Sequence, residues 1–130
     1  MAQMEENCAC SGKNLDRFLQ VAILNELYHE NLHGFVLIQR VAQSPMFHGE
    51  TPDPTGLYRY LKKMENNDLL ASRLELWQNS SSRRVYWITP QGRECFKKWR
   101  QSIIAYRDDL SALIQTMDDT LAQPPKETGR

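Results

Sequence analysis

Residues 54–89 read PTGLYRYLKKMENNDLLASRLELWQNSSSRRVYWIT, and a change of pattern within this stretch decides the fold. Its first part predicts a helix over about 55–66, because apolar residues recur at helical spacing. Pro54 restricts the residue before it, and the Thr55 hydroxyl is suited to capping the helix start. The apolar residues of this expected helix are Leu57, Leu61 and Met64.

The second part changes to a period of two. Apolar and polar residues alternate from Leu70 to Trp77, which predicts a half-buried strand. Residues 78–82 (QNSSS) form a polar turn, and 84–88 predict a second strand that returns beside the first. A helix followed by a β-hairpin is therefore expected in the middle of the chain.

Two more helices are expected before this stretch. Apolar spacing predicts one from Leu15 to Leu27, capped by Asn14, and a shorter one over 35–42 after the break at His33-Gly34. Residues 44–54 contain three prolines and a glycine and are expected to be a loop. Three helices followed by a hairpin with basic residues make a winged helix-turn-helix, a mainly α (α+β) fold with a two-stranded wing.

A long helix is expected after the hairpin, over 90–121, with Thr89 as its cap and Pro90 at its first position. Its apolar residues recur at alternating steps of three and four, which is a heptad pattern. A small winged domain cannot cover such a long seam alone, so its distal half is expected to pack against a second subunit. The expected dimerisation residues are Trp99, Ile103, Tyr106, Leu110, Leu113 and Met117.

Length and composition are consistent with this organisation. The 130 residues, 41% of them hydrophobic, are enough for one domain and an appended element. We expect a flexible arm at 1–13, the winged domain at 14–89, the dimerisation helix at 90–121 and a disordered tail at 122–130. No apolar run is long enough to span a membrane, and the acidic N-terminus lacks a signal-peptide pattern, so a cytoplasmic location is expected.

Charge is distributed unevenly although the net charge is zero. Between Thr55 and Arg84 there are six basic residues and three acidic ones, whereas from Asp108 to Arg130 there are two basic and five acidic. The positive charge is therefore concentrated in the expected third helix and wing. This distribution favours a nucleic-acid partner for that region despite the neutral total.

Three motifs in order resemble the PadR family of transcription regulators. HGFVLIQRV (33–41) resembles the family's second helix, PTGLYRYLKKMENNDLL (54–70) its recognition helix, and RRVYWITPQGRE (83–94) its second wing strand and next helix start. The match covers about 15–100, and the single C-terminal helix is similar to the short form of the family. Asp68 replaces the glycine usual at that position, and the wing tip has serines instead of glycine.

The resemblance implies a homodimeric repressor that binds a palindromic operator in double-stranded DNA. Two recognition helices about 34 Å apart enter successive major grooves of such a site. Arginine and tyrosine contact base edges and phosphates, lysines contact phosphates, and a helix start holds a phosphate on its N–H groups. The implied DNA-binding residues, with the basic ones expected on one side, are Thr55, Tyr58, Arg59, Lys62, Lys63, Arg83 and Arg84.

Two other features of the sequence concern metal and small-molecule binding. Cys8 and Cys10 are soft ligands, but one intervening residue and no further ligands nearby do not make a zinc site, so no metal or cofactor is expected. A redox or metal sensor on these two thiols is the alternative to a plain arm. Four aromatic residues could bind a small aromatic effector between subunits: Trp77, Trp87, Trp99 and Tyr106. The alternative is that they are ordinary residues of the hydrophobic core.

No catalytic constellation is present, since the sequence has no glycine-rich phosphate loop, metal triad or nucleophile elbow. An enzyme is therefore not expected. The rival interpretation is a winged-helix protein-interaction module, an adaptor or anti-repressor, with which the neutral net charge agrees. The basic third helix and wing favour DNA binding over this alternative.

Overall fold

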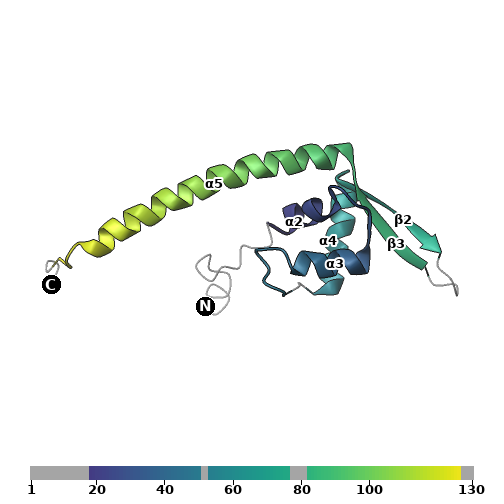
Figure 1. Ribbon diagram of the computed structural model, residues 1–130, viewed down its shortest axis with the longest axis horizontal. Coiled ribbons are helices and arrows are strands. Elements are labelled where there is room, and N and C mark those ends of the chain that lie inside the picture. The colour runs from purple at the N-terminus through teal and green to yellow at the C-terminus, as the bar shows by residue number, and fades with distance from the viewer. Residues whose placement is uncertain (1–17, 51–52, 77–81, 127–130) are drawn as a thin grey trace. The chain divides into compact units, whose positions relative to one another are not determined.

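The computed structural model describes residues 18–50, 53–76 and 82–126. The chain forms two compact units, one extending to Phe96 and one beginning at Lys97. The elements are, in order, α2 (Leu19–Leu27), β1 (Leu32–His33), α3 (Gly34–Ala42), α4 (Pro54–Asn66), β2 (Leu70–Leu76), β3 (Ser82–Ile88) and α5 (Pro90–Ala122) (Figure 1).

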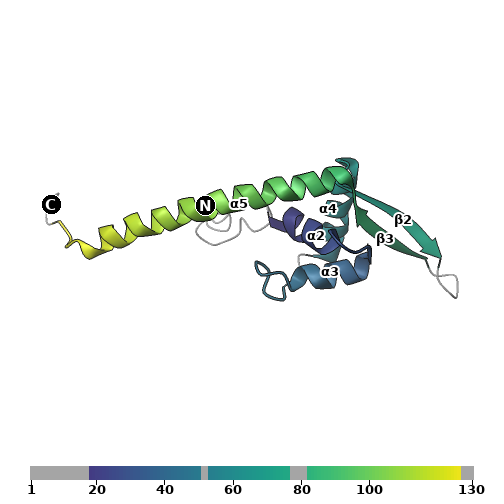
Figure 2. The ribbon, with the colours of Figure 1, turned by 45° about the horizontal axis from the view of Figure 1, so that its top comes forward.

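The predicted hairpin is confirmed as the antiparallel pair β2 and β3. Its register runs from Leu70 opposite Ile88 to Leu76 opposite Ser82. Figures 1 and 2 both show this hairpin projecting beyond the three helices that precede it. β1 pairs antiparallel with the other side of β3, which gives the strand order β1-β3-β2. Two residues are too few to produce a sequence pattern, so β1 was not predicted.

The core of the first unit lies between α2, α3, α4 and the inner end of the hairpin. Helix α4 buries the three predicted residues Leu57, Leu61 and Met64. Each fully buried side chain of this size contributes about 1.5–3 kcal/mol relative to an exposed one. The largest fully buried side chains on the other elements are Ile23, Leu24, Leu27, Leu37, Val41 and Leu70.

A tight joint connects the end of α4, the hairpin and the start of α5. The Thr89 backbone N–H donates to the Leu69 carbonyl at 3.1 Å, and its hydroxyl donates to the Asp68 carbonyl at 2.6 Å. The same hydroxyl accepts from the Gly92 N–H at 2.9 Å, which confirms Thr89 as the predicted cap of α5. A Cβ at Gly92 would collide with the Leu69 carbonyl oxygen and meet Ile88 Cγ1 at 2.8 Å.

Asp68, at this joint, has φ of +63°. The position thus keeps the left-handed backbone for which glycine is favoured, although the residue is aspartate. The turn is closed by Leu69, whose N–H donates to the Met64 carbonyl at 3.0 Å. Asp68 therefore adopts a left-handed conformation that glycine takes without strain.

Helix α5 runs without a break from Pro90 to Ala122, in agreement with the predicted bounds 90–121. Its first turns pack on the first unit, where the Phe96 ring lies 5.1 Å from the Tyr28 ring and Arg93 lies 4.6 Å from the same ring. Within the ranges that the structure describes, no helix is long and apolar enough to cross a membrane. The predicted start of the first helix at Leu15 falls outside those ranges.

Candidate nucleic-acid interface

Helix α4 begins differently from the prediction. The carboxylate of Asp53 accepts from the Gly56 N–H at 3.0 Å and caps the helix, while Pro54 occupies the first helical turn. The expected Thr55 hydroxyl cap is therefore wrong, because Pro54 at the first helical position makes Asp53 the capping residue. Thr55 is an exposed residue of the first turn.

The two faces of α4 have opposite character. Because successive helical residues turn by about 100°, the buried leucines and methionine lie opposite a polar strip. The predicted residues Thr55, Arg59, Lys62 and Lys63 are all exposed and belong to this strip. Asn66, which the sequence analysis left out, is exposed on the same strip one turn further along. The helix thus presents a basic, hydrogen-bonding surface to solvent.

Tyr58 has both a packing role and an exposed surface. Its side chain is 42% exposed, yet its ring lies so close to Gly34 that a Cβ there would be 2.8 Å from Tyr58 Cε1. The same Cβ would be 3.3 Å from Cε1 of the buried Tyr86, whose pKa is raised by that burial. Gly34 therefore allows α3 to approach α4 and the sheet closely.

Arg84 on β3 is connected to α4 through the neighbouring strand. Its Nη1 donates to Ser72 Oγ at 2.9 Å, and the Ser72 hydroxyl donates to Glu65 Oε1 at 2.9 Å. Glu65 belongs to α4, so this chain of hydrogen bonds joins the expected recognition helix to the wing. It orients the guanidinium of Arg84 on the side of the sheet that faces α4.

Arg83 lies on the other face of the hairpin. Successive strand residues point to opposite faces, and Arg83 is opposite Glu75 in the register whereas Arg84 is opposite Leu74. The five basic residues of α4 and the wing were expected on one side. This expectation is wrong for Arg83, because Arg83 and Arg84 point to opposite faces of the sheet. Consecutive strand positions made this outcome predictable from the alternation alone.

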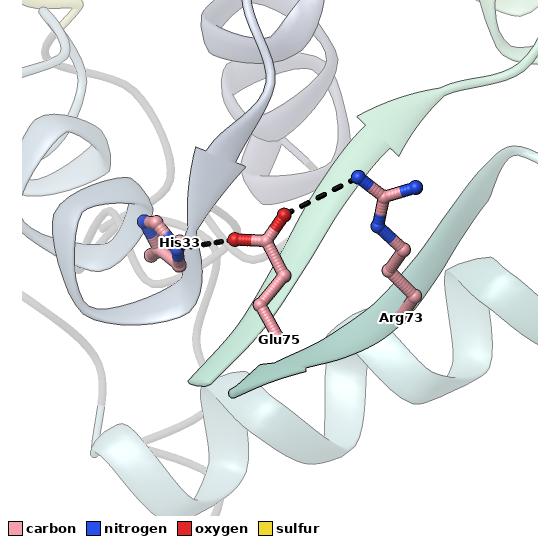
Figure 3. A network of polar contacts seen from close by, with 3 residues as sticks. All are labelled: His33, Arg73 and Glu75. Atoms are coloured by element: carbon pink, nitrogen blue, oxygen red, sulfur yellow. Dashed lines mark hydrogen bonds and ion pairs between the residues drawn. The ribbon is translucent and has the colours of Figure 1, made fainter. Parts of the chain in front are cut away.

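A polar network lies on the same face of the hairpin as Arg83 (Figure 3). Glu75 accepts from Arg73 at 3.3 Å through one carboxylate oxygen, and its other oxygen lies 3.1 Å from His33 Nε2. The hydrogen bond with His33 and then the one with Arg73 lower the pKa of Glu75. The Arg73 guanidinium also lies 5.9 Å from the Trp87 ring centre. The network holds the wing to His33, the residue that precedes α3.

Comparison with known proteins decides the family. The sequence model of the transcriptional regulator PadR-like family matches residues 23–98, more than half of the chain. This chain belongs to the PadR-like family. The resemblance of the three motifs is thereby confirmed, and the family is one of transcriptional regulators and not of enzymes. No match was found among curated proteins.

Solved PadR structures share the fold. A PadR family regulator from Eggerthella lenta is 22% identical with a TM-score of 0.72, covering 89% of this chain and 98% of that one. A PadR-like regulator from Bacillus cereus is 22% identical with a TM-score of 0.65, covering 78% and 95%. A PadR family regulator from Clostridium difficile is 19% identical with a TM-score of 0.65, covering 75% and 98%. At these identities the likeness shows the PadR winged-helix fold alone.

The predicted dimerisation residues of this PadR-like chain all lie on α5 in the second unit. Trp99 and Ile103 are half-buried, and the four that follow are between 44% and 55% exposed. Ile114 and Leu121, which the heptad analysis left out, are exposed apolar residues of the same helix. The apolar stripe is thus longer and wider than the predicted seam.

Two observations on the described residues concern the metal and effector alternatives. They contain no group of three or more His, Cys, Asp or Glu side chains suited to a metal, and Cys8 and Cys10 lie outside them, as does Trp77. A surface hollow of about 720 Å³ lies beside α2 and α3, and its lining contains no aromatic residue. The aromatic pocket expected between two subunits stays a prediction.

Proposed function

We propose that this PadR-family regulator binds operator DNA with the exposed strip of α4. The observation that carries the proposal is the position of Thr55, Arg59 and Lys62 opposite the buried face of a helix that follows α3 in a helix-turn-helix. The N-terminal residues of such a second helix reach base edges in the major groove. Arg59 supplies a fork for a guanine edge, while Lys62 and Lys63 neutralise phosphates.

The wing supplies a second contact with the DNA. Ser72 and Glu65 hold Arg84 on the side of the sheet that α4 occupies. In this position the guanidinium can contact a phosphate, or the minor groove next to the major groove that α4 enters. Arg83, on the opposite face, reaches the DNA only from the edge of the hairpin. Tyr58 contributes the exposed part of its ring, and Thr55 a hydroxyl at the helix start.

The functional form is a homodimer acting as a repressor on a palindromic site. The exposed apolar stripe of α5 supports self-association, because a monomer would leave these side chains in water. A dimer presents two copies of α4 to two half-sites. A small-molecule or stress signal releases the repressor from its operator. An aromatic effector bound between the subunits is one such signal.

The experiment is a fluorescence-anisotropy titration against the region upstream of the protein's own gene, at about 50 and 200 mM salt. We expect tight binding that weakens with salt and is lost in Arg59→Ala/Lys62→Ala. The matched control is Lys126→Ala/Arg130→Ala, which removes the same charge from the C-terminal end and should leave binding unchanged. An equal loss in both variants would show that net charge, and not the α4 strip, governs binding.

A second comparison separates base reading from phosphate contact. Arg59→Lys keeps the charge but removes the guanidinium that can make two hydrogen bonds to a guanine edge. The preference for operator over random duplex should therefore fall about tenfold or more. Lys62→Ala should weaken binding to both duplexes equally and reduce the salt slope by about one. If the wild type binds no fragment better than random duplex and neither variant changes anything, the adaptor interpretation replaces this proposal.

A further inference from the structure

The hairpin carries large apolar side chains where it has already left the core. Alternate residues along a strand share a face of the sheet, and so do residues directly opposite each other on two antiparallel strands. Leu70, Tyr86 and Ile88 share the face directed toward α4, and all three are buried. Further out on the same face, Leu74 and Leu76 are 59% and 86% exposed. The apolar pattern of β2 thus continues beyond the core.

Packing within the hairpin does not account for these two leucines. Their partners on β3 are Arg84 and Ser82, so neither leucine is level with an apolar side chain. The opposite face of the same outer part carries Arg73, Glu75 and Arg83, which is the usual composition of a sheet face in water. Neighbouring apolar side chains exposed on one face therefore indicate a surface that contacts another molecule.

The residues beside the leucines indicate what that molecule is. Arg84 is directly opposite Leu74, and its Nη1 donates to Ser72 Oγ at 2.9 Å. Ser72 in turn donates to Glu65 of α4, so the leucines lie outward of Arg84 on the side of the sheet that faces α4. A guanidinium next to apolar side chains is suited to duplex DNA, because the phosphates are anionic while the faces of the bases are apolar. The surface continues the DNA contact proposed for α4 and Arg84.

The hairpin meets the DNA at a minor groove. In the proposed function α4 occupies the major groove, and the hairpin projects beyond the helices in both Figure 1 and Figure 2. The next groove along the duplex is a minor groove, which is only about 6 Å wide. Two strands about 4.8 Å apart, with leucine side chains on one face, do not fit into that width unless the groove opens. Apolar side chains open it by entering between two base pairs, which kinks the duplex toward the major groove.

We propose that Leu74 and Leu76 enter the minor groove beside each half-site and kink the operator. The inference rests on the DNA binding of the proposed function and adds two residues that determine which operator is preferred. This preference needs no hydrogen bond to a base, because the free energy of kinking depends on the base step that is unstacked. Pyrimidine–purine steps (TA and CA/TG) unstack most easily, so the operator should have such a step where the wing lies.

Energy transfer between dyes at the two ends of the operator duplex measures the kink. The wild type should raise the transfer efficiency above that of the free duplex. Leu74→Gln/Leu76→Gln should return it nearly to the free value and weaken binding about tenfold. The matched control Leu74→Met/Leu76→Met should keep both the kink and the affinity, because methionine has the size of glutamine but is apolar. A wild type that does not bend the operator, or a glutamine variant that bends it equally, would overturn the proposal.

The base step provides a second readout. In the fragment that binds in the anisotropy titration, each pyrimidine–purine step beside the half-sites is replaced in turn by AA, which is stiffer. One replacement should weaken binding of the wild type about tenfold and leave the affinity of the glutamine variant unchanged, because the variant no longer kinks that step. If no replacement affects the wild type more than the variant, the leucines do not read the step and the proposal fails.

The outcomes distinguish this proposal from the one on which it rests. If the wild type binds its operator but the glutamine variant binds and bends it identically, the leucines do not contact DNA and the proposal for α4 stands. If neither protein binds any DNA fragment, both proposals fail. A glutamine variant that keeps the kink but forms smaller assemblies in sedimentation velocity would show that the leucines join copies of the protein instead.

Discussion

His33 Nε2 and Glu75 Oε1 lie 3.1 Å apart although 42 positions separate the two residues in the sequence. The contact joins the residue before α3 to the second-last residue of β2, and Arg73 binds the same carboxylate. The orientation of the wing is therefore fixed by a side chain from the helix-turn-helix as well as by the backbone of the sheet.

Acid should weaken this connection. The pKa of Glu75 is lowered from its usual 4.5, so its contribution to stability is present above that pH and is lost as the pH falls through the lowered pKa. Glu75→Gln keeps the size and a hydrogen-bonding oxygen but removes the charge. Thermal melts of both proteins from pH 7 to 3 should show a melting-temperature difference that shrinks below about pH 4.5. A difference that is constant with pH would contradict the role of the charge.

Gly92→Ala should destabilise the first unit by about 1–3 kcal/mol, because the added Cβ meets the Leu69 carbonyl and Ile88. The matched control is Gly56→Ala, where the nearest atom to a Cβ is Asp53 Oδ2 at 3.8 Å. In α4 that change should be neutral or stabilise by about 0.5–1 kcal/mol. Urea denaturation measures both free energies of unfolding, and equal effects would show that the joint at Leu69 is not tightly packed.

Asp68→Gly should stabilise the protein by up to about 1 kcal/mol, because φ of +63° costs an L side chain more than glycine. Asn67→Gly, one residue earlier at φ of −92°, should give no such gain. The measurement is the free energy of unfolding of the two variants in urea. A larger gain at 67 than at 68 would contradict the left-handed assignment.

Ser72→Ala should weaken operator binding about threefold, because Arg84 loses the acceptor that orients it. In the Arg84→Ala background the same change should have almost no effect, since nothing remains to be oriented. Anisotropy titrations of the four proteins form a double-mutant cycle. Additive losses would mean that Ser72 acts on stability or on DNA independently of Arg84.

The sequence predicted the elements with clear periodicity and the contacts within one element. The switch of period at Leu70 located α4 and the hairpin, and Thr89-Pro90 located the start of α5. β1 was missed because it is two residues long and depends on pairing with Val85 and Tyr86. The exposed strip of α4 follows from helical geometry, and its role in binding DNA stays a prediction, as do the dimerisation residues.

Contacts between residues far apart in the chain could not be predicted from the sequence. Nothing in the local sequence distinguishes Glu75 from any other carboxylate on the wing. Its contact with His33 depends on the pairing of β1 with β3. The connection from Arg84 to Glu65 likewise depends on Ser72 lying on the same face of the neighbouring strand. The Asp53 cap could have been chosen correctly, because a proline at the first helical position leaves the residue before it to act as the cap.

The unbroken course of α5 from Pro90 to Ala122 has a consequence for how such a regulator evolves. One residue inserted after Phe96 would rotate the exposed apolar stripe of α5 by about 100° relative to the helical residues before the insertion. Seven residues would restore the phase to within about 20° and lengthen the helix by about 10 Å. Insertions of whole heptads therefore keep the apolar stripe in phase with the start of α5, and a single inserted or deleted residue is the change that this helix tolerates least.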